Sequence, residues 1–160
     1  MPMSLEGSCQ CGAVNFTVQS RTPVPYQRCY CSICRQSAGG GGFAVNIGAI
    51  ADSLSCDNWE GLGSYHAVHD SGRASHGERF FCKTCGSQLW LFDERWPDLV
   101  HPLASVIDTK LPVPSAITHI WLADKPDWVE AEIGKGDRSF DGYPDLSLEE
   151  WHRAKGVWAE

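Results

Sequence analysis

No apolar run in this sequence approaches the roughly 20 residues that a membrane-spanning helix needs. Residues 1–7 contain neither a basic region nor an apolar stretch, so nothing in them marks the chain for secretion. Basic residues are scarce and form no stripe: 13 Lys and Arg stand against 20 Asp and Glu, for a formal charge of −7. These absences lead us to expect neither a membrane nor nucleic acid among the partners.

The sequence also has no internal repeat, linker or low-complexity tail, which predicts a single domain over residues 1–160. Its apolar segments are short and separated by turn residues, among them 16 glycines and 9 prolines, as is typical of β structure. Strands are expected at 13–18, 43–45 and 116–122, and a hairpin around the cysteines at 82 and 85. The four glycines at 39–42 are expected to form a flexible run.

The only expected helix lies near the end of the chain. Ser147 and Glu150 have the spacing of a capping box, Trp151 and Ala154 continue the helical pattern, and Gly156 can end it. We therefore expect a mainly-β fold of short antiparallel sheets with a short C-terminal helix.

Cysteines, by contrast, are plentiful, and seven of the eight are grouped in three clusters with the spacing of metal-binding knuckles. The clusters are Cys9 and Cys11; Cys29, Cys31 and Cys34; and Cys82 and Cys85. This spacing is typical of zinc sites, in which thiolates bind the ion tetrahedrally. Seven thiolates exceed one tetrahedral site and fall one short of two. We therefore expect two zinc ions, one of which either takes an eighth ligand from elsewhere or keeps an open position.

A disulfide framework is the alternative, since eight is an even number. The pairs separated by a single residue would form very short, strained loops if oxidised, whereas two such thiolates readily share a metal ion. A chain of 160 residues also buries enough apolar surface to need no cross-links. We therefore expect reduced, metal-binding thiols and a reducing compartment, the cytoplasm.

Glycine indicates which clusters share an ion. The residue after the second cysteine of a knuckle often needs a positive φ, which glycine adopts without steric cost. Glycine follows the first and third clusters, as Gly12 and Gly86, whereas Arg35 follows the middle cluster. We therefore expect the first and third clusters to form one closed four-thiolate site.

The middle cluster can supply three corners of a tetrahedron from one loop and leave the fourth for water or a substrate. The alternative is a second structural site completed by a further side chain. The candidates for that ligand are Cys56, His66, His69 and His76. We favour the open site, because the histidines form no spaced pair and Cys56 is typical of a small buried residue on a strand.

Taken in order, the motifs point to one family. They are G-x-C-x-C-G at 7–12, C-x-C-x-x-C-R at 29–35, an aromatic residue before C-x-x-C-G at 81–86, and a late His-Ile-Trp at 119–121. Over most of its length, from about residue 4 to 128, the chain resembles the glutathione-dependent formaldehyde-activating enzyme family, which includes centromere protein V.

The resemblance implies a zinc-containing β-tent fold and a carbon–sulfur lyase activity, the reversible addition of glutathione to formaldehyde. It implies a structural zinc ion held by Cys9, Cys11, Cys82 and Cys85. It implies a catalytic zinc ion held by Cys29, Cys31 and Cys34. Two departures from the family pattern predict a pocket that differs there: Tyr30 in place of the usual histidine, and the glycines at 39–42.

A zinc ion with three thiolates and one free position can bind a thiol as thiolate and lower its pKa. The expected partners are therefore a small-molecule thiol and a carbonyl substrate, with Arg28 and Arg35 as the nearest cations in sequence. No general base or other catalytic side chain is assigned. The alternatives are a noncatalytic zinc-stabilised binding module and a sulfoxide reductase that uses Cys56, whose thiolate the neighbouring Asp57 disfavours.

Overall fold

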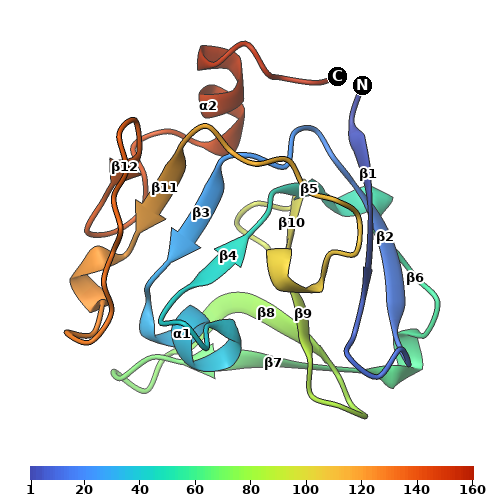
Figure 1. The fold of residues 1–160 in the computed structure, drawn as a ribbon. Coiled ribbons are helices and arrows are strands. Elements are labelled where there is room, and N and C mark those ends of the chain that lie inside the picture. Colours follow the sequence, from blue (N-terminus) through green and yellow to red (C-terminus); the bar gives the residue numbers. More distant parts are fainter.

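The computed structural model describes residues 1–160 as three small sheets joined by turns and short helices (Figure 1). The first sheet has the strand order β1 (Met3–Ser8), β2 (Asn15–Ser20), β6 (Ser55–Cys56). The second has the order β5 (Ala49–Ile50), β10 (Leu99–Pro102), β9 (Gln88–Asp93), β8 (Ala74–Cys82), β7 (Leu62–Val68). The third has the order β12 (Arg138–Ser139), β11 (Ile117–Ile120), β3 (Tyr26–Cys29), β4 (Ala44–Asn46).

Helical segments are few and short. The α-helices are α1 (Ser32–Ala38) and α2 (Leu148–Ala154). Single 3-10 turns occupy Ala51–Ser53, Trp59–Gly61, Ala104–Val106 and Leu122–Asp124. Neither α-helix is long and apolar enough to cross a membrane.

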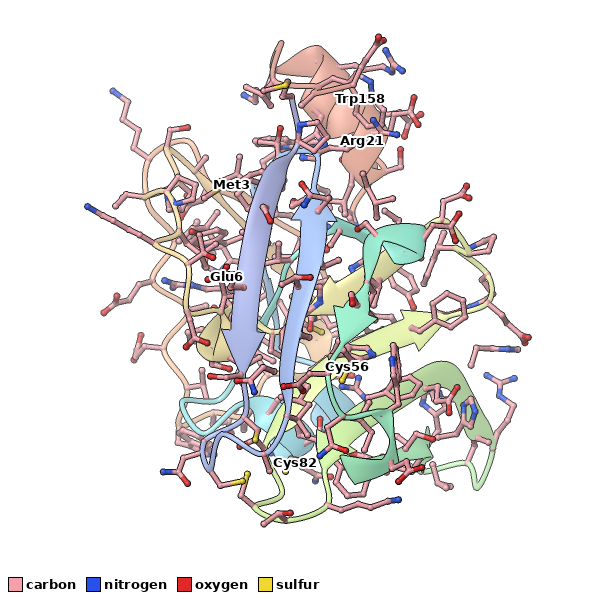
Figure 2. The ribbon with its side chains drawn as sticks, turned by 90° about the vertical axis from the view of Figure 1, so that its right-hand side faces the viewer. Met3, Glu6, Arg21, Cys56, Cys82 and Trp158 are labelled. Carbon is pink, nitrogen blue, oxygen red and sulfur yellow. The ribbon has the colours of Figure 1, made fainter.

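The main core contains side chains from the first and second sheets. Along β1 and β2 the side chains alternate, so Leu5 and Val18 face inward. Glu6, which follows Leu5 in β1, faces solvent (Figure 2). Leu5 and Val18 belong, together with Leu89 of β9, to a cluster of 13 buried residues. Cys56 on β6 lies in the same cluster, which confirms that it is a small buried residue on a strand.

The expected mainly-β class with a short C-terminal helix is confirmed, and β8 and β9 form the expected antiparallel hairpin. One sheet differs from the expectation of antiparallel pairing, because β11 runs parallel to both β3 and β12. Parallel neighbours need a long connection between them. The chain between β3 and β11 contains the whole of the second sheet and supplies that connection.

Helix α1 was not predicted, and its unusual cap explains why. The Cys31 thiol accepts a hydrogen bond from the Cys34 N–H at 3.3 Å, at a position where Ser, Thr, Asp or Asn usually serves. The helix is only 7 residues long, so periodicity does not reveal it either. The expectation of a single late helix was therefore wrong.

The glycines at 39–42, expected as a flexible run, form the turn between α1 and β4, with Gly39 and Gly42 buried and Gly40 and Gly41 exposed. The Gly42 N–H donates to the Gly39 carbonyl at 2.8 Å, and Gly42 has a φ of +95°. A side chain on Gly42 would also clash with Val129. Glycine is required here for its backbone conformation and for space.

Helix α2 has the predicted ends. The Ser147 hydroxyl accepts from the Glu150 N–H, and the Glu150 carboxylate accepts from the Ser147 N–H. Gly156, with a φ of +66°, follows the helix as expected. Beyond it, the Trp158 ring packs under the Arg21 guanidinium at 4.5 Å, which brings the last residues beside the end of β2 (Figure 2).

A buried histidine in α2 makes the stability of the fold depend on pH. His152 is buried, its Nε2 donates to the Val24 carbonyl, and its Nδ1 has no partner. Burial lowers the pKa of His152, so the folded protein keeps the ring neutral at a pH where the unfolded chain protonates it. The contribution of neutral His152 to the unfolding free energy is therefore complete above about pH 6.5, and it is lost as the pH falls below that value.

We expect His152→Gln to reduce that pH dependence, because glutamine takes up no proton. The measurement is urea unfolding of both proteins at about pH 7.5 and about pH 5.5. Protonation of metal ligands affects both proteins alike and cancels in the comparison. His69→Gln, on an exposed turn, is the matched control and should behave as wild type. A full wild-type difference between the two pH values in His152→Gln would contradict this assignment.

Candidate metal centres and their cavity

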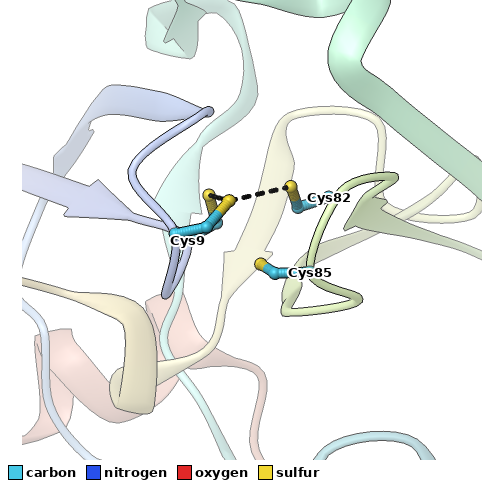
Figure 3. Close-up of side chains that lie close together, drawn as sticks. Cys9, Cys82 and Cys85 are labelled. Atoms are coloured by element: carbon cyan, nitrogen blue, oxygen red, sulfur yellow. Dashed lines mark hydrogen bonds between the residues drawn. The ribbon is translucent and has the colours of Figure 1, made fainter.

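Four thiols from two distant hairpins converge at one end of the main core. Cys9 and Cys11 lie between β1 and β2, and Cys82 and Cys85 lie at the turn between β8 and β9 (Figure 3). All four sulfurs lie within 4.8 Å of one another; Sγ of Cys11 is 3.6 Å from Sγ of Cys9 and 3.9 Å from Sγ of Cys82. Sulfurs bound tetrahedrally at about 2.3 Å from zinc are roughly 3.8 Å apart. This four-thiol group therefore fits a zinc ion.

The two turns that carry the four-thiol group have the same backbone geometry. Gly12 has a φ of +76° and Gly86 a φ of +77°. The N–H of each glycine donates to the carbonyl of the first cysteine of its own turn, Cys9 or Cys82. Glycine adopts this conformation without steric cost. The expectation that the first and third clusters come together is confirmed, and so is the reason that glycine follows each.

The exposed thiols of the four-thiol group differ in acidity. Hydrogen bonds from the Ser87 hydroxyl and then from the Ser87 N–H lower the pKa of Cys85 to about 5. A backbone hydrogen bond from Ala13 does not offset the effect of the neighbouring sulfurs, which raise the pKa of Cys11 to about 11. The lowered pKa favours the thiolate of Cys85, and a bound cation would favour ionisation of the others.

The middle cluster forms a separate three-thiol group. Cys29 ends β3, Cys31 caps α1 and Cys34 lies in its first turn, with all three sulfurs within 4.8 Å of one another. No fourth Cys, His, Asp or Glu ligand atom joins them. The group does not include any of Cys56, His66, His69 and His76, the residues considered for closing a second site.

Within the three-thiol group, Cys34 Sγ accepts two side-chain hydrogen bonds from the sheets around it. Arg79 Nη2 on β8 lies 3.3 Å away, and Asn46 Nδ2 on β4 lies 3.7 Å away. Hydrogen bonds from Cys29 and Cys31, and then the charge of Arg79, hold the pKa of Cys34 well below that of a free thiol. Hydrogen bonds with Cys31 and then Cys34 raise the pKa of Cys29, so the negative charge of the group is centred on Cys34.

The arginine that donates to the three-thiol group is Arg79, not Arg28 or Arg35, which are nearest in sequence. The Arg28 guanidinium lies 4.8 Å over the Phe43 ring, and neither of these two arginines lines the cavity described below. Arg79 is 45 residues from Cys34 along the chain, and the packing of β8 against α1 brings them together. The one signal in the sequence is an arginine just before the aromatic residues that lead into the third knuckle.

A cavity of about 690 Å³ opens next to the three-thiol group, within the range of small-molecule sites. The three thiols, Asn46 and Arg79 all line it. The surrounding wall comes from β8, β9, β10, β11 and the residues that begin α2. The group is therefore accessible to a ligand, whereas its two buried members, Cys29 and Cys34, are protected from bulk solvent.

Aromatic side chains form part of the cavity wall. Tyr143 packs edge-on against Trp96 and Trp121, with ring centroids 5.8 and 5.0 Å away. Trp121 has a φ of +60°, which is uncommon for a bulky residue and costs roughly 1–3 kcal/mol. Such conformations cluster at functional sites, and this one directs the end of β11 into the cavity wall.

Comparison with known proteins agrees with this geometry. Residues 4–124 match the family model described as glutathione-dependent formaldehyde-activating enzyme. The chain belongs to this family. A relative from Halomonas elongata, provisionally named a glutathione-dependent formaldehyde-activating enzyme, is 55% identical over 155 residues, which cover 97% of this chain and 98% of the relative. A Rhodobacter sphaeroides protein of known crystal structure, 23% identical, matches 69% of this chain and 92% of its own with a TM-score of 0.50, and shares the fold.

Neither of the two departures from the family pattern, Tyr30 and the glycines at 39–42, lines the cavity. Tyr30 is fully buried, and its hydroxyl lies 2.9 Å from His119 Nδ1, while His119 Nε2 lies 3.3 Å from Asp137 Oδ2. The histidine of the family's His-Ile-Trp motif is thus a hydrogen-bonded core residue, and Tyr30 contributes to the layer behind the thiols.

Proposed function

We propose that this protein is a zinc-dependent carbon–sulfur lyase, which adds a glutathione-like thiol reversibly to formaldehyde or a related small carbonyl compound. The observation that carries the proposal is the three-thiol group in the cavity wall, which has no fourth protein ligand. The family and the named relative support glutathione and formaldehyde as the substrates. We assign the activity to the cytoplasm, where such thiols stay reduced.

The proposal includes two zinc ions with different roles. The four-thiol group would hold a structural ion, because its closed ligand set ties the β1–β2 hairpin to the β8–β9 hairpin. The three-thiol group would hold a catalytic ion with one position free for substrate. An ion bound there would take up the substrate thiol as thiolate and lower its pKa, so that the nucleophile is present at neutral pH.

The reaction combines one thiol and one aldehyde into one product. The thiolate sulfur attacks the carbonyl carbon and forms the C–S bond, while the π electron pair of the C=O bond moves to oxygen. That oxygen takes a proton from water, and the proton that the thiol released returns to the solvent, so that no proton is gained or lost overall. The cavity holds the two reactants together, which supplies much of the rate advantage of a bound reaction. Arg79 and Asn46 keep Cys34 ionised by donating to its sulfur.

Local cations must bind an anionic thiol such as glutathione, because the formal charge of −7 gives no long-range attraction. Of the arginines in the cavity wall, Arg95 is already held by the Asp93 carboxylate at 2.6 Å. Arg73 lines the cavity and forms no ion pair. We therefore propose Arg73, in place of Arg28 and Arg35, as the contact for a substrate carboxylate.

The test is a titration of cobalt-substituted protein with small thiols, followed by the visible absorption of the metal. We expect uptake of about two ions per chain, with a change in the bands of one of them. Glutathione and cysteine should cause that change, whereas S-methylglutathione should not, since it has no thiol. A wild-type protein whose bands respond to no thiol would contradict the proposed function.

Exchange measurements with formaldehyde then distinguish an enzyme from a carrier. Thiols and aldehydes combine appreciably without a catalyst, so the rate is compared with that background. We expect acceleration that depends on the bound thiol. Thiol binding without acceleration would make the protein a noncatalytic zinc-stabilised binding module.

A further inference from the structure

Arg79 is a buried arginine without a carboxylate partner. It is only 8% exposed, and no Asp or Glu lies within ion-pair distance. Its Nη2 donates to Cys34 Sγ and its Nη1 to Ser37 Oγ, both at 3.3 Å, while Nε has no partner. A buried charge without a counter-charge is costly. The three-thiol group is therefore the counter-charge of this guanidinium.

The four-thiol group has no comparable cation. Two of its members, Cys11 and Cys85, are exposed, so solvent screens the charge of that group. The donors to its sulfurs are backbone N–H groups, such as that of Val14, and the Ser87 hydroxyl, all of them neutral. Cys29 and Cys34 of the three-thiol group are buried, so its charge must be balanced by the protein itself.

Charge balance then depends on what occupies the open position. Three thiolates around a divalent ion leave one net negative charge, which Arg79 offsets. A neutral fourth ligand keeps this balance, whereas an anionic ligand adds a second negative charge to a partly buried site. Without the guanidinium, the anionic complex would hold two uncompensated charges, and the neutral complex only one. Removing Arg79 should thus penalise anionic ligands more than neutral ones.

We propose that Arg79 makes the open position selective for anionic ligands, so that a thiolate binds there in preference to a neutral donor. This inference rests on the proposed function and names Arg79 as a residue that determines specificity through charge, without contacting the reacting atoms. Asn46 offers a natural contrast, because it donates a neutral N–H to the same sulfur.

The experiment compares azide, an anion, with imidazole, a neutral donor, as ligands of the cobalt-substituted protein, with equilibrium binding read from the visible bands. Arg79→Gln keeps an N–H donor near Cys34 but removes the charge, and Arg79→Lys restores the charge. We expect Arg79→Gln to weaken azide relative to imidazole by about 10- to 100-fold, the effect of one charge roughly 6–12 Å from the ligand at an effective dielectric constant of about 20. Arg79→Lys should keep most of the wild-type ratio.

Asn46→Leu is the matched control. It removes a neutral donor from the same sulfur, so it should change both affinities by a similar factor and leave their ratio near that of wild type. A selective loss of azide binding in Asn46→Leu as well would mean that any missing hydrogen bond has this effect, and would overturn the role of charge.

Equal effects of Arg79→Gln on azide and imidazole would overturn the proposal. Arg79→Met is the second neutral variant, in case glutamine is not tolerated at this buried position. Loss of the fold, or of the cobalt ion at the three-thiol group, in both neutral variants would make Arg79 a structural residue and also overturn it. Azide and imidazole are not thiols, so a wild type that binds azide selectively but responds to no thiol would contradict the proposed function alone.

Discussion

Replacement of Cys85 by serine is expected to unfold the domain or make it insoluble. Cys85 is exposed on a turn, where a substitution ordinarily changes stability very little. As a ligand of a structural zinc ion, however, it would help to join two hairpins in which Cys11 and Cys82 are 71 residues apart. Binding of zinc at such a site supplies free energy comparable to the whole stability of a small domain. Thermal unfolding by circular dichroism should show no transition, or one lowered by more than about 20 °C.

Cys56→Ser is the control for this experiment. Cys56 is buried in the main core but belongs to neither thiol group. Burying a hydroxyl in its place costs about 1–3 kcal/mol, which lowers Tm by roughly 5 °C in a domain of this size. Burial alone predicts that Cys56→Ser is the more damaging change, and zinc binding predicts the reverse order. A milder effect of Cys85→Ser than of Cys56→Ser would rule out the structural zinc ion.

Replacement of Cys31 by serine should abolish the response to thiols and leave the fold intact. Cys31 caps α1 by accepting the Cys34 N–H, and serine is among the best residues at that position. The helix therefore keeps its cap, while the three-thiol group loses one of its three metal ligands. The measurements are Tm, which should stay within a few °C of wild type, and the glutathione titration of the cobalt protein, which should give no spectral change.

Cys31→Ala separates the two roles of this side chain. Alanine removes the cap as well as the ligand, so it should cost about 1 kcal/mol more than serine and give the same loss of the thiol response. If Cys31→Ser unfolds the protein as badly as Cys85→Ser does, the three-thiol group is structural and the proposed activity has no site.

Several features of the site follow from local patterns in the sequence. The spacing of the cysteines identified the three clusters, because ligands one to three residues apart reach one ion only from a tight turn. Gly12 and Gly86 identified the two turns that come together, since both need a positive φ. The capping box of α2 and the hairpin at the third cluster were predicted for the same reason: each depends on residues close together in the chain.

Other features depend on how the sheets meet, and local patterns carry no information about that. Helix α1 was missed because a thiol serves as its cap, and the parallel pairing of β11 with β3 was missed because it joins strands from opposite halves of the chain. Packing also decided the place of Tyr30, which is buried beside His119 and does not line the cavity.

The sequence by itself determined that this chain carries two groups of thiols with zinc-site spacing, and which cysteines belong to each, because those facts depend on spacing and backbone conformation within short turns. Only the tertiary structure decided that Cys34 accepts hydrogen bonds from Arg79 and Asn46, and that the three-thiol group borders a cavity. The three residues come from α1, β8 and β4, which are brought together by burial of apolar surface across two sheets. The charge that surrounds the proposed catalytic ion is therefore a consequence of packing between sheets.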